Sequence, residues 1–443
     1  MTPRLAILSL GIAAVAFAQA PSNNPIAQTA PPLSSTAERV YETSRAKILQ
    51  VRTLLQAAGR QSSLGSGFVV TTDGLAVTNY HVVSRFALDP KTYRLEYLAP
   101  DGARGPLKLL AIDVANDLAV VKLERSGPAP FEFDPRALAG RLPKGERIYA
   151  MGNPLDLGFT IVEGTYNGLV DRSYDERIHF SGAINAGMSG GPVTSADGRV
   201  VGINVAKRID GEEVGFLVPA KHAAALLERA RKGPALVVDK AREEVGRQLD
   251  AWQAGFYEAL KANGFRQSSF GPYRGLESSA PWITCWASTN ADQLPRARTS
   301  VNTTRCSSET GIFVSDRILT GRLDMSHAYY KAIDLNAFQF AKELSQRGGG
   351  FDGRDTKRLT EQQCRDDFVV AAAGRPSLRA TWCMRAYREF EGLYNVTVVA
   401  LTQDRDREAL LSQLTLQGVS HANAVALGRR FLEAIEWAPG PTP

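Results

Sequence analysis

Cysteine is scarce in this sequence and lies late in the chain. Only four cysteines occur among 443 residues, and the first is Cys285. None has the Cys-X-X-Cys spacing of a zinc site, and so low a count excludes a small disulfide scaffold. In an exported chain an even number fits two disulfides with three possible connectivities. Pairing by neighbours is the simplest choice and gives Cys285–Cys306 and Cys364–Cys383.

Histidine is also sparse, and massed positive charge is missing. Four of the five histidines are isolated, namely His179, His222, His327 and His421. No pair has the helical spacing of metal ligands, so we expect no metal and no cofactor. The net charge of +6 comes from lysines and arginines scattered along the chain, which argues against a nucleic-acid partner.

Long apolar runs are absent beyond the N-terminus. Arg4 precedes an apolar stretch at 5–17, and Ala16-Phe17-Ala18 has the small-X-small pattern of a signal-peptidase site. Cleavage after Ala20 also fits, but it would leave Pro21 just after the cut. The sequence therefore predicts a signal peptide at 1–18 and a flexible leader at 19–37. We expect export to the bacterial periplasm or the outside, with no stable membrane span after cleavage.

The segment 38–232 reads as short β-strands after a helix at 37–41, which Ser35 or Thr36 can cap. Candidate strands are 48–54, 67–71, 76–79, 93–98, 108–113, 118–123, 147–152, 161–166, 177–180, 193–194, 200–205 and 214–218. So many short strands in so few residues favour an all-β sandwich or an all-β double β-barrel over a βαβ fold. A helix at 219–231 follows.

A second domain is predicted at 236–443, after the break Lys232-Gly233-Pro234. A long amphipathic helix at 237–263 opens it. The rest mixes β-like runs at 311–314, 378–387 and 394–401 with helices at 335–346, 406–414 and 422–437. We therefore expect an α+β domain that holds all four cysteines, and its function is unknown.

Three residues in the first domain can carry chemistry. The loop 187–192 reads Gly-Met-Ser-Gly-Gly-Pro, and its glycines allow a tight turn around Ser189. A serine hydroxyl needs a base to become a nucleophile, and His81 stands at the end of an apolar strand. Asp117 leads into the strand 118–123, with Asp113 as a rival acid. The order His81, Asp117, Ser189 is that of chymotrypsin-type enzymes.

Several short motifs occur in a fixed order along this segment, and together they indicate a protein family. They are Gly-Ser-Gly-Phe at 65–68, Thr-Asn-Tyr-His-Val-Val at 78–83, Asn-Asp-Leu-Ala-Val at 116–120, Gly-Asn-Pro at 152–154, the serine loop 187–192, Val-Gly-Ile-Asn at 201–204 and Gly-Phe-Leu-Val-Pro-Ala at 215–220. Over about 38–232 this pattern resembles the trypsin-like serine proteases of the HtrA/Deg branch. Met188 departs from it, since the family usually has asparagine there. The C-terminal half does not resemble the PDZ domains that HtrA proteins usually carry.

The resemblance implies a serine endopeptidase with His81 as base, Asp117 as orienting acid and Ser189 as nucleophile. The backbone N–H groups of Gly187 and Ser189 would form the oxyanion hole. By the same resemblance the primary pocket is lined by Ala183, Ile184, Asn204, Val205 and Ala206. None of these is acidic, so we expect cleavage after small or medium aliphatic residues rather than after arginine or lysine.

Two functions remain open from the sequence. The first is an exported endopeptidase that acts on unfolded or exposed segments of protein and peptide substrates. The alternative is a latent or inactive protease domain in a protein-binding or scaffold protein whose C-terminal domain does the work. Met188 and the large unassigned domain motivate the alternative, whereas the complete triad opposes it. The oligomeric state is unknown.

Overall fold

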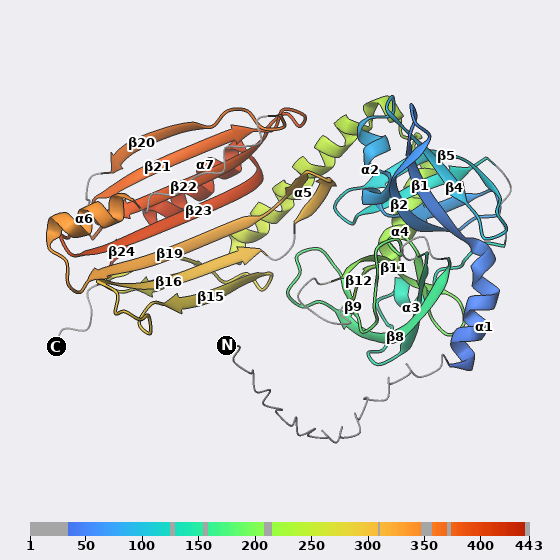
Figure 1. Ribbon diagram of the computed structural model, residues 1–443, viewed down its shortest axis with the longest axis horizontal. Helices are drawn as coiled ribbons and strands as arrows, with labels where there is room; N and C mark the ends of the chain where they lie inside the picture. Colours follow the sequence, from blue (N-terminus) through green and yellow to red (C-terminus); the bar gives the residue numbers. More distant parts are fainter. Residues whose placement is uncertain are drawn as a thin grey trace, which may run out of the picture.

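The structure is a computed structural model in which two barrels and a broad sheet are joined by a long helix (Figure 1). It describes residues 34–124, 129–153, 158–207, 215–308, 311–346, 357–369 and 374–438. The predicted signal peptide and most of the predicted leader lie outside these residues. The leader ends earlier than expected, because helix α1 (Ser35–Ser44) already begins at Ser35. Its N-cap is Ser34, which accepts from the N–H of Ala37, and neither Ser35 nor Thr36 has that role.

The first barrel is closed in the order β1-β2-β3-β6-β5-β4. Its strands are β1 (Ile48–Leu55), β2 (Arg60–Val69), β3 (Leu75–Thr78), β4 (Tyr93–Leu98), β5 (Arg104–Asp113) and β6 (Leu118–Leu123). A 3₁₀ turn (Arg45–Lys47) leads into β1, and helix α2 (Tyr80–Leu88) follows β3. The strand before His81 therefore ends at Thr78, and His81 itself lies in the first turn of α2.

The second barrel is closed in the order β10-β11-β12-β9-β8-β7. Its strands are β7 (Arg147–Gly152), β8 (Thr160–Leu169), β9 (Ile178–Phe180), β10 (Pro192–Thr194), β11 (Val200–Lys207) and β12 (Gly215–Pro219), with the short helix α3 (Pro135–Leu138) before β7. Closure pairs every strand on both sides and leaves no open edge. The expected double barrel is confirmed.

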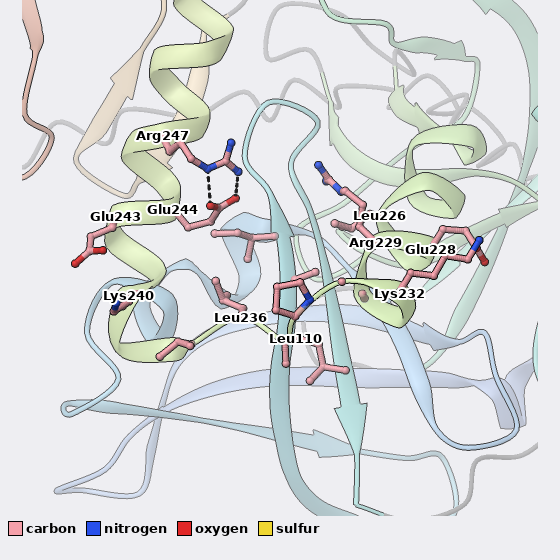
Figure 2. A pocket seen from close by; sticks show the side chains of 17 residues that line it. Leu110, Leu226, Glu228, Arg229, Lys232, Leu236, Lys240, Glu243, Glu244 and Arg247 are labelled. Carbon is pink, nitrogen blue, oxygen red and sulfur yellow. Dashed lines mark hydrogen bonds and ion pairs between the residues drawn. The ribbon is translucent and has the colours of Figure 1, made fainter.

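Helices connect the barrels to the rest of the chain. Helix α4 (Ala220–Lys232) closes the barrel segment, and a 3₁₀ turn (Val238–Lys240) leads into α5 (Ala241–Asn263). Between α4, β5 and α5 lies a cleft of about 880 Å³ with largely apolar walls (Figure 2). At its rim the guanidinium of Arg247 donates to Glu244 at 2.8 Å.

The C-terminal region is built on a seven-stranded sheet in the order β15-β16-β19-β23-β22-β21-β20. Its strands are β15 (Ile283–Thr289), β16 (Thr299–Ser308), β19 (Leu323–Ala332), β20 (Gln363–Val369), β21 (Leu378–Ala386), β22 (Leu393–Thr402) and β23 (Glu408–Ser420). Helix α5 and helix α7 (His421–Glu433) pack on one face through a shared core that includes Phe256, Leu414 and Phe431. Helix α6 (Ala337–Ser345) lies at one end of the sheet (Figure 1).

Two smaller β-elements complete this region. A three-stranded sheet holds β13 (Phe265–Phe270), β14 (Tyr273–Ser278) and β24 (Glu436–Trp437), and a hairpin holds β17 (Ile312–Ser315) and β18 (Ile318–Thr320). Disulfides join Cys285 to Cys306 and Cys364 to Cys383, each between directly paired residues of adjacent strands. The region is α+β, as expected.

Two of the expected helices in this region are wrong in whole or in part. Residues 406–414 were expected to be helical but enter β23, where burial alternates and the side chains of Ser412, Leu414 and Leu416 are buried. A strand with one face on the core has this period of two. The last expected helix ends at Glu433 rather than at 437, because Glu436 and Trp437 pair with β14.

Candidate active site

Asp117 holds His81 by both its backbone and its ring. One carboxylate oxygen accepts from the backbone N–H of His81 at 2.8 Å, and the other lies 2.7 Å from His81 Nδ1. Asp117 stands on a tight turn before β6 with φ 58°, in the left-handed region that aspartate tolerates better than most residues. Its carbonyl accepts from the side chain of Asn79 at 2.7 Å and from the N–H of Tyr80 at 3.2 Å. The turn is therefore locked onto the start of α2.

The charge of Asp117 sets the basicity of His81. Burial lowers the pKa of the imidazole, but the negative charge and hydrogen bond of Asp117 outweigh burial, and Asp316 adds a further negative charge. The pKa of His81 is therefore raised above its ordinary value. The imidazole side chain is still 27% exposed, so a proton acceptor of increased strength faces a solvent-accessible space.

Asp113, the rival acid, faces elsewhere. One of its carboxylate oxygens accepts from the N–H of Asn116 at 3.1 Å. The other accepts from the side chain of Asn116 at 3.1 Å and from Arg229 at 3.4 Å. Among the described residues the acid that contacts His81 Nδ1 is thus Asp117 and not Asp113.

Ser189 comes from the second barrel, in the loop before β10. Its hydroxyl donates to the carbonyl of Val205 at 3.3 Å. Within the described part of the chain, no hydrogen bond joins this hydroxyl to His81. Ser189 is half-buried. Asp117 and His81 are therefore hydrogen-bonded to each other, whereas the hydroxyl of Ser189 is hydrogen-bonded to β11.

The serine loop is pinned to the first barrel by Ser66. The N–H of Ser66 donates to the carbonyl of Ser189 at 2.7 Å, and its hydroxyl donates to the carbonyl of Gly187 at 2.7 Å. The same hydroxyl accepts from the N–H of Asn153 at 3.0 Å. Ser66 belongs to the quoted motif 65–68, yet the sequence alone gave it no role.

Backbone amides of the loop divide into two groups. The N–H groups of Met188, Gly190 and Gly191 donate to the carbonyls of Asn185, Asn204 and Met188 at 2.9–3.0 Å. Those of Gly187 and Ser189 have no acceptor among the described residues. Gly187 has φ 93°, a conformation that favours glycine. Two unused amide donors therefore flank Met188.

The side chain of Met188 points away from this site. It is fully buried in the core of the second barrel with Phe180, Ile184 and Val193. The packing is tight, since a Cβ on Gly152 would lie 2.7 Å from the Met188 Cα and 3.0 Å from the hydroxyl of Ser66. An apolar residue at 188 thus anchors the loop by packing.

The residues expected to line the specificity pocket do not form one surface. Ala183 is exposed, whereas Ile184 belongs to the barrel core. The buried side chain of Asn204 donates to the carbonyl of Met151 at 2.9 Å. Val205 is half-buried and meets Ser189 through its carbonyl, and the side chain of Ala206 is outside the described residues.

Besides the role of Ser66, sequence reasoning missed a contribution to the site from the C-terminal region. The ring of Phe313 in β17 lies edge-to-face against the imidazole of His81, with centroids 5.8 Å apart. The two residues are far apart in sequence, and no local motif links them.

The described residues offer little for a metal or a membrane. Their one cluster of potential metal ligands is Glu277 with Cys285 and Cys306, and these cysteines are bonded to each other. A disulfide leaves no thiolate to bind a metal. Within the described ranges no helix is long and apolar enough to cross a membrane.

In a comparison with known protein families, residues 65–203 match the family model described as a trypsin-like peptidase domain. HhoB of Synechocystis sp., named as a serine protease, is 36% identical over 177 residues, covering 38% of this chain and 40% of that protein. A protein of Rickettsia conorii named as a DegP-like periplasmic serine endoprotease is 33% identical over 180 residues. The match covers 38% of this chain and 34% of the Rickettsia protein. The crystal structure of the serine endoprotease from Yersinia pestis shares 24% identity at a TM-score of 0.39, covering 46% of this chain and 70% of that one.

The two closed barrels and the matched family model define the class of this part of the chain. It is a trypsin-like peptidase domain. The relatives that this domain matches include proteins named as serine proteases and as DegP-like serine endoproteases. The chain spans two fifths or less of the length of the two relatives named here.

Proposed function

We propose that this protein is an exported serine endopeptidase that hydrolyses peptide bonds in unfolded or exposed segments of protein and peptide substrates. The observation that carries the proposal is the double hold of Asp117 on His81, at 2.8 Å and 2.7 Å. Fixing both the backbone and Nδ1 leaves Nε2 as the ring nitrogen that can accept a proton. The relatives named as serine proteases support the same reaction class.

The proposed first half-reaction forms an acyl-enzyme. Ser189 leaves the carbonyl of Val205, turns toward His81, and attacks the substrate carbonyl as His81 Nε2 takes its proton. Asp117 stabilises the imidazolium that results. The unused amides of Gly187 and Ser189 donate to the oxyanion, and each such donor is worth about 3–4 kcal/mol in the transition state. His81 then returns the proton to the leaving amine.

The second half-reaction uses the same groups with water as nucleophile. His81 takes a proton from water, the hydroxide attacks the ester of Ser189, and the returning serine receives the proton. No metal or cofactor takes part in this scheme.

For specificity we propose cleavage after small or medium aliphatic residues. The side chains of Ile184 and Asn204 are buried. The remaining positions expected at the pocket, Ala183, Val205 and Ala206, carry no carboxylate that would attract arginine or lysine. A peptide library digested by the full chain should give aliphatic residues before the cut. Arginine or lysine at that place would overturn this part of the proposal.

Export is supported by the two disulfides, because disulfides persist in oxidising compartments. The Rickettsia relative is named as periplasmic, which agrees with this location. N-terminal sequencing of protein recovered from a bacterial periplasm should begin at Gln19. An uncleaved N-terminus in the cytoplasmic fraction would contradict export.

The reaction itself is tested by labelling Ser189. The purified full chain should react with a fluorophosphonate probe and cleave casein, and Ser189→Ala should abolish both. The exposed Ser288→Ala in β15 is a matched control that should keep both. Absence of labelling and of cleavage in the unchanged chain would defeat the proposal in favour of a latent protease domain.

A further inference from the structure

The β17–β18 hairpin belongs to the C-terminal region but packs on the first barrel. Its buried residues Ile312, Val314 and Ile318 join the core that also holds Tyr80 and Val83 of α2. The hydroxyl of Tyr80 donates to the carbonyl of Val314 at 3.0 Å in a fully buried setting. The hairpin is therefore an integral part of the packing around the helix that carries His81.

A second set of contacts fixes the hairpin at its ends. Near its turn, Asp316 accepts from Arg85 of α2 at 2.6 Å. At its far end the hydroxyl of Thr320 is 2.9 Å from that of Tyr387, and the N–H of Gly321 donates to the carbonyl of Gln417 at 3.2 Å. The hairpin thus spans from the seven-stranded sheet to α2 with both ends held.

The other face of the hairpin presents Phe313 to the catalytic base. Phe313 is paired with Leu319 across the two strands, so both side chains lie on this face. The Phe313 ring meets the imidazole of His81 with an interplanar angle of 72°, and it also meets the ring of Tyr80 at 6.4 Å. Leu319 is 51% exposed, whereas Phe313 is half-buried.

The hydrogen bond from Asp117 to Nδ1 restrains rotation of the His81 ring about its Cβ–Cγ bond. Because a hydrogen bond tolerates a range of angles, the ring plane can still oscillate about its mean orientation. An aromatic ring packed edge-to-face resists this rotation through van der Waals contact and the preferred geometry of the pair. Correct aim of Nε2 matters, because proton transfer requires hydrogen-bond reach to the nucleophile.

We propose that Phe313 is a positioning residue that fixes the ring plane of His81 for proton transfer. The C-terminal region thereby completes the active site of the barrels. The catalytic consequence rests on the proposed peptidase function, whereas the restraint on the ring is a physical property that can be measured in its absence.

The experiment uses the full chain labelled with ¹⁵N-histidine, which gives a simple spectrum because the chain has five histidines. The His81 signals are assigned by their loss in His81→Gln. In the unchanged protein we expect one tautomer and a slowly exchanging Nδ1 proton bonded to Asp117. Phe313→Ala should broaden that proton signal and speed its exchange with water.

Kinetics of peptide hydrolysis supply the second readout. An aromatic pair is worth about 0.5–1.5 kcal/mol, which corresponds to a loss of roughly 2- to 13-fold. Phe313→Ala should lower kcat by that factor and change KM less than twofold. Phe313→Tyr keeps the ring and should restore both the proton signal and kcat. Leu319→Ala truncates the neighbouring side chain on the same hairpin and should leave both unchanged.

The outcomes separate the two proposals. An unaltered His81 signal in Phe313→Ala overturns the positioning role, even if the free energy of unfolding falls. The same change in Leu319→Ala would also overturn it, since a loosened hairpin would then be the cause. An unchanged chain that shows the restrained ring but neither labelling of Ser189 nor hydrolysis defeats the peptidase proposal and leaves the positioning of His81 supported.

Discussion

The two halves of this molecule solve the problem of sheet edges in different ways. In the barrels every strand is paired on both sides, and that half contains no cysteine. The C-terminal sheet is open, and β15 and β20 form its two edges. Each edge strand is tied to its inner neighbour by one disulfide, Cys285–Cys306 at one edge and Cys364–Cys383 at the other.

The difference shows where covalent bonds are useful in a β-protein. An edge strand has hydrogen bonds on one side only, and β20 is exposed along its whole length. A cross-strand disulfide keeps such a strand in place after its hydrogen bonds open. Barrel closure achieves the same end without cysteine. The proposed catalytic residues therefore lie in the half that contains no disulfide, although Phe313 of the other half contacts His81.

The largest expected effect lies in the barrel half. Asp117→Asn removes the acceptor that both His81 groups use, and an amide facing Nδ1 favours the wrong tautomer. We expect kcat for peptide hydrolysis to fall about 10⁴-fold. The control is Asp113→Asn, which removes the rival carboxylate and should change kcat little. Equal losses in the two variants would show that the structure assigns the acid wrongly.

Removal of the disulfides should act on the other half. Each bridge closes a loop, with sequence separations of 21 and 19. Replacing either pair by serine should lower the free energy of unfolding of the sheet by about 3 kcal/mol. Hydrogen exchange read by mass spectrometry should show faster exchange in β15 or β20 and unchanged exchange in the barrels. Equal loss of protection throughout the barrels would contradict separate stabilisation.

Acid should weaken the C-terminal half through His327. Burial lowers the pKa of this imidazole to about 4, although the carbonyl of Leu276 accepts a hydrogen bond from it. In the unfolded chain the pKa of this histidine is about 6.5. Between about pH 4 and pH 6.5 the imidazole is therefore protonated in the unfolded state and neutral in the folded state. The free energy of unfolding should therefore fall by roughly 3 kcal/mol as the pH drops from about 6.5 to about 4.

The slope of stability against pH in urea denaturation measures this effect. His327→Gln should flatten the slope, whatever its effect at neutral pH. His421→Gln removes an exposed histidine at the start of α7 and should keep the slope. A slope that survives in His327→Gln would assign the acid sensitivity to another group.

The smallest expected effect is that of a residue in the C-terminal half on a residue in the barrel half. Asp316 in the hairpin turn helps to raise the pKa of His81, beside the larger influence of Asp117. Asp316→Asn removes that charge, so the pKa of His81 falls and the neutral base persists to lower pH. The acidic limb of the pH profile of kcat should shift slightly to lower pH. The shift is small, because Asp316 is half exposed and paired with Arg85.

Asp197→Asn, in an exposed turn of the second barrel, is the control for that profile. It should leave the acidic limb where it is. A shift of the limb to higher pH in Asp316→Asn would contradict the stated direction.

Much of the barrel half could be predicted from the sequence, because its signals are local. Alternating apolar residues and Gly/Asp turns indicate the strands, and His81, Asp117 and Ser189 each sit in a short motif. Residues 406–414 show the limit. Leu410, Leu411 and Leu414 fit a helical stripe as well as a strand, and the deciding partners β19 and β22 come from elsewhere in the chain.

The site beyond the triad could not be predicted for the same reason. Tyr80 and Val314 meet across 234 positions of sequence, and the contact between His81 and Phe313 has a similar span. Ile184 lies just before the serine loop in sequence and Asn204 lies in β11, yet both side chains are buried in the barrel. Local patterns place elements, whereas the direction of each side chain depends on the packing of distant strands.

Ser66 makes the geometry of the candidate active site depend on both barrels at once. It stands on β2 of the first barrel, while its partners Gly187, Ser189 and Asn153 all belong to the second. A change in the angle between the barrels would therefore strain these hydrogen bonds to the serine loop. The position of Ser189 therefore depends on how the two barrels are docked against each other, and not on the fold of the second barrel alone.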